Sequence, residues 1–160
     1  MSISINKLFH HNPVGIQNKA SIKIDVLKET TSQLISNLKE VKQSAVTSSS
    51  AHPVSSDKIN KCFKKLQREC NRIVSNSEKF QKKHYVKDHD AVGLDALKLN
   101  VNLNKFIKMT PMTEAQKESL LNMRDTVNSA IKSSTSTKTG NGVNMDDVYK
   151  KIAQFKSHDY

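Results

Sequence analysis

Residues 57–87, with the sequence DKINKCFKKLQRECNRIVSNSEKFQKKHYVK, decide the fold that this chain is predicted to adopt. Mostly apolar side chains recur along the stretch in alternating steps of four and three, which is the spacing of one buried face of an α-helix. Ser56 or Asp57 provides an N-cap, because a short side-chain oxygen accepts a bond from an unpaired backbone N–H there. The predicted buried seam comprises Ile59, Phe63, Leu66, Cys70, Ile73, Ser77, Phe80 and His84.

A similar seam comes earlier in the chain and predicts a helix over residues 22–45. Its members also alternate by three and four residues, so the two helices are expected to pack as an antiparallel pair. A Ser-rich linker, SAVTSSSAHPVSS at 44–56, separates them and contains Pro53. The first seam comprises Ile24, Leu27, Thr31, Leu34, Leu38, Val41 and Ala45.

The stretch 91–109 fits two kinds of structure, with the ambiguity centred on 95–104. Its apolar residues alternate as in a strand, yet they also form two helical arcs, one with Leu94 and one with Phe106. We favour a helix with Asp90 as its cap, because a strand would need a partner among short alternations near Ile3 or Ile22. The residues concerned are Leu94, Leu97, Leu99, Val101, Leu103 and Phe106.

Two further helices are predicted, over 111–133 and 145–156. Thr113 and Gln116 have capping-box spacing at the first, and Asn144 caps the second. The predicted apolar faces are Ala115, Leu120, Met123, Val127, Ala130 and Ile131, and then Met145, Val148, Ile152 and Phe155.

The sequence therefore predicts an all-α bundle of four to five helices. Residues 1–20 are expected to be a flexible leader, since they contain no acid and include the helix breakers Pro13 and Gly15. Residues 21–160 are expected to form one helical domain with a flexible loop at 133–142.

The charge of the chain is concentrated in one place. The 160 residues carry 26 Lys and Arg against 15 Asp and Glu, a formal net charge of +11 and a pI near 9.7. Between Lys58 and Lys87 ten basic residues face only two acids, which accounts for eight of the eleven charges. Heptad positions place most of them away from the seam, so this helix is predicted to bind an anionic partner. The candidate binding residues are Lys58, Lys61, Lys64, Lys65, Arg68, Arg72, Lys79, Lys82 and Lys83.

Three kinds of anionic partner fit such a face: an acidic host protein, an anionic membrane, or nucleic acid. A solvated face without a partner is the alternative. Nucleic acid is the second choice, because only three of the 26 basic residues of the chain are arginine and the predicted helix exposes no aromatic rings for stacking.

Candidate chemical sites are weak in this sequence. His84, Asp88, His89 and Asp90 could form a metal cluster, but neighbouring lysines repel a cation, so no metal is expected. Cys62 and Cys70, two helical turns apart, are too distant for a disulfide and indicate a reducing compartment. No cofactor motif or catalytic constellation is recognised, which favours a non-enzymatic protein.

The N-terminal stretch MSISINKLFHHNP, rich in Ser, Ile and Asn, resembles the export segment of bacterial type III secreted effectors. The resemblance implies export by an injection apparatus, a chaperone bound near residues 20–45, and action inside a host cell. No Sec signal peptide and no transmembrane segment are predicted, so the expected location is a host cell or the bacterial cytoplasm.

The predicted function is therefore that of an interaction protein, a secreted effector or an accessory of one, that binds a host protein or anionic membrane through helix 57–87. The alternative is a nucleic-acid-associated protein of phage or plasmid origin. A homodimer or another partner is also expected, because either could bury the apolar faces of long helices with few aromatic residues.

Overall fold

The structure is a computed structural model that describes residues 20–47, 56–132 and 144–155. Within these ranges the chain forms five helices and one pair of two-residue strands, which confirms the predicted all-α bundle. The elements are β1 (Ser21–Ile22), α2 (Ile24–Thr47), α3 (Ser56–Lys83), α4 (Val86–Met109), α5 (Glu114–Ser129), β2 (Ile131–Lys132) and α6 (Met145–Gln154).

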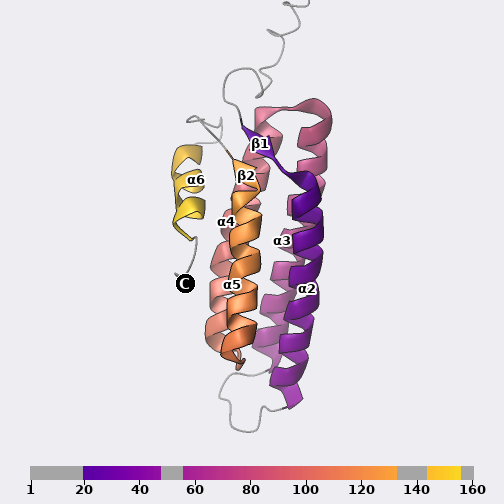
Figure 1. The fold of residues 1–160 in the computed structure, drawn as a ribbon, viewed down its shortest axis with the longest axis vertical. Coiled ribbons are helices and arrows are strands. Elements are labelled where there is room, and N and C mark those ends of the chain that lie inside the picture. Colours follow the sequence, from indigo (N-terminus) through magenta and orange to yellow (C-terminus); the bar gives the residue numbers. More distant parts are fainter. Residues whose placement is uncertain (1–19, 48–55, 133–143, 156–160) are drawn as a thin grey trace, which may run out of the picture.

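Four long helices form the body of the molecule. In Figure 1, α2, α3, α4 and α5 run along the long axis, and α6 lies outside the bundle beside α4. Helices α2 and α3 are antiparallel, because Lys28 pairs with Glu78 near one end and Lys42 donates to Asn60 near the other. Buried residues from all five helices join one hydrophobic core.

The helical seams predicted for α2 and α3 form much of this core. All seven members of the first seam are buried, and so are all members of the second except His84. Leu34 and Leu66 are fully buried. Burying a Leu side chain stabilises a fold by about 1.5–3 kcal/mol, so this pair of helices supplies a large part of the stability.

Helix α4 resolves the ambiguity between helix and strand over 91–109. Its two apolar arcs differ in burial. In one arc Leu99, Leu103 and Phe106 are fully buried in the core, whereas in the other Leu97 is half-buried and Val101 is exposed. An amphipathic helix needs only one buried arc, so the second arc is left at the surface.

The turn between α3 and α4 corrects two predictions. Helix α3 ends at Lys83 rather than at residue 87, because His84 has a left-handed backbone with φ of 59° and its side chain is exposed. Such a residue terminates a helix in the way that glycine usually does. Helix α4 begins at Val86 rather than at residue 91, with Tyr85 at the N-cap, so Asp90 lies inside the helix and does not cap it.

The boundaries of α5 are also shorter than predicted. The helix begins after Thr113, whose side chain forms the predicted capping box with Gln116. It ends at Ser129 instead of residue 133, because the next residues pair with β1, Ile22 opposite Ile131. That backbone partner lies more than 100 residues earlier, so local sequence gives no sign of it.

Other predictions fall partly or wholly outside the described residues. Of the predicted leader only Ala20 is described, and it is buried against Phe80, which corrects the prediction for that residue. Residues 1–19, the linker at 48–55 and the loop at 133–142 are outside the described ranges. The Asn144 cap of α6 is confirmed, since its side chain accepts from the backbone N–H of Asp146.

Candidate anion-binding face

All nine predicted binding residues lie on α3 and are exposed, and we call them the basic face. Most of them follow the steps of three and four that keep side chains on one side of a helix. For the eight from Lys61 to Lys83, the described residues provide no acidic group within 4.0 Å. The face comprises Lys58, Lys61, Lys64, Lys65, Arg68, Arg72, Lys79, Lys82 and Lys83.

Acidic residues are distributed differently over the bundle. Helix α3 contains nine basic residues against three acids. Helix α2 has three of each, and α5 has three acids against Lys117 and Arg124. Arg124 is fully buried, so the surface of α5 is acidic. The α3 side of the bundle therefore carries a positive potential that the α2 and α5 side does not share.

Two buried carboxyl groups lie beneath the basic face, between α3 and α4. Asn102 donates to Glu69 over 2.6 Å, and Asn76 donates to Asp95 over 3.0 Å. Glu69 and Asp95 are each only 7 % exposed as residues. These bonds cross the interface in both directions and fix the register of α3 on α4, because a buried polar group that loses its partner costs about 1–3 kcal/mol.

Burial also determines the ionisation of these two groups. It raises the pKa of Glu69 and of Asp95, although the Asn bonds and positive charge from Lys98 and from Lys65 or Arg72 oppose it. Glu69 Oε1 has no hydrogen-bond partner among the described residues, so its carboxyl group is only half satisfied. Glu69 and Asp95 thus face inward, where they do not compete with an anionic ligand, whereas Asp57 and Glu78 of α3 are exposed.

The four residues considered for a metal site are not brought together as ligands. His84 is exposed at the end of α3, whereas His89 and Asp90 are buried in α4. His89 Nε2 faces the backbone carbonyls of Ser21 and Lys132, and Nδ1 lies 2.5 Å from the Tyr149 hydroxyl. Both ring nitrogens are therefore engaged within the protein. In the described parts of the chain, no three His, Cys, Asp or Glu side chains are grouped to hold a metal.

The two cysteines are free and buried, as their spacing predicts. The Cys62 thiol donates to the backbone carbonyl of Asn102 over 3.4 Å. Burial raises the pKa of Cys62, and it raises that of Cys70 to about 12. Both therefore remain thiols at neutral pH, and the thiolate is the nucleophilic form. They pack as small apolar side chains.

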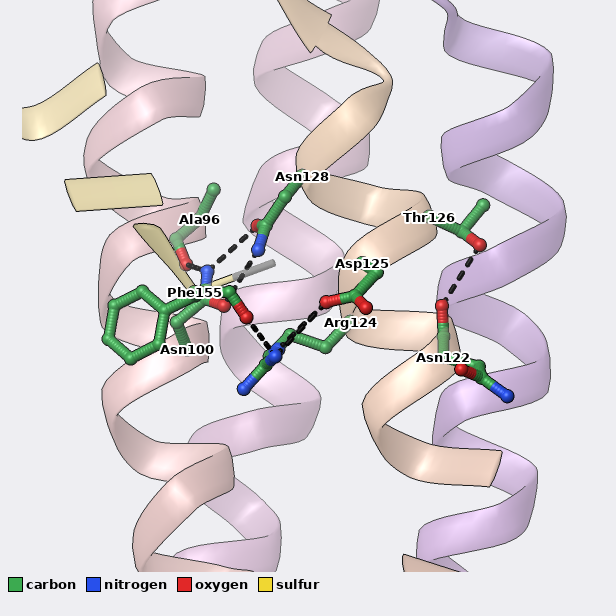
Figure 2. Close-up of polar contacts among 8 residues, drawn as sticks. All are labelled: Ala96, Asn100, Asn122, Arg124, Asp125, Thr126, Asn128 and Phe155. Carbon is green, nitrogen blue, oxygen red and sulfur yellow. Dashed lines mark hydrogen bonds and ion pairs between the residues drawn. The ribbon is translucent and has the colours of Figure 1, made fainter. Parts of the chain in front are cut away.

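Sequence reasoning missed a polar cluster that holds α6 to the bundle. The Tyr149 hydroxyl donates to Asp90 over 2.9 Å and contacts His89. Arg124 reaches from α5 to the backbone carbonyl of Phe155, and Asn100 and Asn128 exchange bonds of 2.9 Å beside it (Figure 2).

A signal for part of this cluster was present in the sequence. Arg124 lies four residues after Leu120 and three before Val127, which puts it on the buried face of α5. Asn100 has the same relation to Ala96 and Leu103 on α4. Polar residues in core register indicate buried hydrogen bonds, because such groups are rarely buried without partners.

Comparison of the chain with protein-family models, with curated proteins and with solved structures finds no significant match. None of the helices within the described ranges is both long and apolar enough to cross a lipid bilayer.

Proposed function

We propose that this chain is a non-enzymatic binding protein that docks on an anionic partner through the basic face of α3. The observation that carries the proposal is the separation of charge: eight exposed cations of α3 have no acidic group within 4.0 Å among the described residues, and the surface of α5 is acidic. Exposed cations that face one way steer anionic partners and accelerate their association.

Two features favour a protein partner over nucleic acid or membrane. Phe63 and Phe80 are almost fully buried, so α3 offers no ring on which a base could stack. Val101 is the one large apolar side chain classed as exposed in the described ranges, and it lies on α4. The basic face itself therefore has no apolar side chain to insert into a bilayer.

The resemblance of the N-terminal stretch to type III export segments supports a proposal for where the protein acts. We propose that the chain is exported by a type III apparatus and binds its partner inside a host cell, where the two free thiols stay reduced. Deleting residues 2–20 should abolish secretion, as measured in culture supernatants. Continued secretion of the shortened chain would refute this setting and leave the binding proposal intact.

The binding proposal is tested with three probes over a salt series: polyglutamate, phosphatidylserine vesicles and duplex DNA. We expect binding to polyglutamate that weakens with salt, because the contacts are ionic. Replacing Lys61, Lys65, Arg68 and Lys82 by Glu should abolish this binding, and circular dichroism should show unchanged helicity.

A matched variant distinguishes the effect of where the charges lie from the effect of the total charge on binding. Replacing four exposed lysines elsewhere by Glu, at Lys23, Lys39, Lys132 and Lys150, changes the net charge by the same amount. This control should retain most of the binding, and equal losses in both variants would refute a specific face. Preference for DNA, with a log–log salt slope of about −5 from roughly six phosphate contacts, would indicate nucleic-acid binding instead.

A further inference from the structure

The second apolar arc of α4 forms one wall of a groove against α6. The groove has a volume of about 450 Å³ and is lined by Leu97, Val101, Lys151, Gln154 and Phe155. Val101 is 41 % exposed, while Leu97 and Phe155 are half-buried. The volume lies within the roughly 300–1,000 Å³ of small binding clefts, and the floor is apolar.

The far wall of the groove is held in place by a buried arginine. Arg124 is fully buried, donates to the Phe155 carbonyl, and has its guanidinium carbon 5.7 Å from the Phe155 ring centre. Figure 2 shows this side chain extending from α5 to the end of α6. A wall fixed in this way loses little conformational entropy when a ligand binds, which favours affinity.

Positive charge surrounds the groove. Lys98 and Lys105 lie three residues before and four after Val101, so they flank it on the same side of α4, and Lys151 belongs to the lining. All three are exposed, and none of the described residues that line the groove is acidic.

The two lysines that flank the groove, Lys98 and Lys105, are also close to the interface between α4 and α3. The positive charges of Lys98 and Lys65 both lower the pKa of the buried Glu69 carboxyl group, and those of Lys105 and Lys65 both lower the pKa of Cys62. These lysines of α4 and α3 therefore stand on either side of the same interface. One ligand that spans α3 and α4 can contact the basic face and fill the groove.

We propose that the partner is an acidic protein segment that places one large apolar side chain in this groove while its carboxylates contact Lys98, Lys105 and Lys151. This inference rests on the proposed function and narrows it to a protein partner. An apolar anchor surrounded by charge is the usual composition of a short recognition segment, since the anchor supplies affinity and the charges supply specificity. Nucleic acid offers no such anchor, and a flat bilayer does not fit a concave site.

The test is a selection of random short peptides, displayed on phage, against the full chain. Enriched peptides should carry Asp and Glu around one large apolar residue, and a synthetic copy should bind at least about tenfold more weakly to V101Q. The V101L variant should bind as well as the parent. Because Val101 is exposed, neither change should alter the unfolding midpoint.

Three outcomes would overturn the inference. The first is acidic peptides whose binding is unchanged by V101Q but abolished by the charge reversal on α3. This result would place the binding site on the basic face and not in the groove. Peptides without acidic residues would exclude the proposed partner class. Peptide binding that requires deletion of residues 156–160, with none to the full chain, would assign the groove to the end of the chain itself.

Discussion

Helix α3 and helix α6 are attached to the bundle in different ways. The α2–α3 interface is closed by apolar side chains such as Leu34 and Leu66, and two polar contacts lie near its ends, Lys28 with Glu78 and Lys42 with Asn60. The contact between α6 and the bundle, which we call the α6 dock, has three buried apolar residues and a polar centre in which Tyr149 meets His89 and Asp90. The dock's apolar residues are Met145, Val148 and Ile152.

The difference teaches that the two interfaces respond to different changes. Apolar burial depends on contact area and hardly on pH, so the α2–α3 interface should be sensitive mainly to lost volume. Hydrogen bonds depend on geometry and protonation, so the α6 dock should be sensitive to small displacements and to acid.

The largest effect is expected from Leu66→Ala in the α2–α3 interface. Leu66 is fully buried, and removal of its branched end leaves a cavity, so the free energy of unfolding should fall by about 2–5 kcal/mol. Urea denaturation followed by circular dichroism measures this loss. Lys64→Ala on the exposed side of the same helix should change it by less than about 0.5 kcal/mol, and similar losses for both variants would contradict the interface.

A smaller and local effect is expected from Gly93→Ala in the α6 dock. A Cβ at this position would lie 2.9 Å from Tyr149 Cε1, so either the ring, which is held by its hydrogen bonds, or α6 as a whole must shift. Overpacking of this kind costs about 1–3 kcal/mol. Amide hydrogen exchange should accelerate in α6 and stay unchanged in α2 and α3.

The control for this substitution is Lys108→Ala on the exposed side of α4. It introduces the same helix-favouring residue with no neighbour to displace. Unchanged exchange of α6 amides in Gly93→Ala would show that the ring yields freely and that the dock is not tightly packed.

Acid should loosen the α6 dock. Burial lowers the pKa of His89, although its backbone bonds and Asp90 oppose this, so the folded protein favours the neutral ring. The unfolded chain then binds more protons below the ordinary pKa of 6.5, and stability falls as the pH decreases from about 7 through that value. Exchange of α6 amides should therefore accelerate between about pH 7 and 5, and His89→Gln should remove that dependence.

The α3–α4 interface should respond to acid in the opposite direction. Because the pKa of Glu69 and of Asp95 is raised, the folded protein binds more protons, and stability is lost as the pH rises through the folded pKa values. Glu69→Gln should flatten this part of the pH profile of the unfolding midpoint. A profile that is identical in Glu69→Gln and the parent would show that the pKa of this carboxyl group is the same in the folded and the unfolded chain, and so is not raised by burial.

The smallest effect is expected from the ion pair between Lys28 and Glu78. Both side chains are about half exposed, at 50 % and 49 %, so water screens their 3.0 Å contact. Lys28→Ala should lower the free energy of unfolding by less than about 1 kcal/mol, again by urea denaturation. A loss as large as that of Leu66→Ala would mean that polar contacts contribute to the α2–α3 interface as they do to the α6 dock.

Helix periodicity predicted the apolar interface well and the polar one poorly. The α2 and α3 seams follow from spacing alone, because a helix repeats every 3.6 residues whatever it packs against. The same register placed eight of the nine cations outside, all except Lys83. Contacts such as that of His89 with Tyr149 join residues 60 apart, and Ile22 meets Ile131 through backbone atoms, so no local pattern encodes them. One wall of the groove could be predicted from the second apolar arc of α4. The other wall, at Phe155, could not, because it depends on where α6 packs.

The pairing of β1 with β2 brings the beginning and the end of the four-helix body together. Ser21 lies opposite Lys132, and the Lys23 N–H donates to the Ala130 carbonyl over 2.9 Å, so the chain enters and leaves this body at one point. A short peptide could join residues 20 and 133, and new ends could be opened between α2 and α3 without cutting either of these two helices. The body should therefore tolerate circular permutation, with its order of helices in space unchanged.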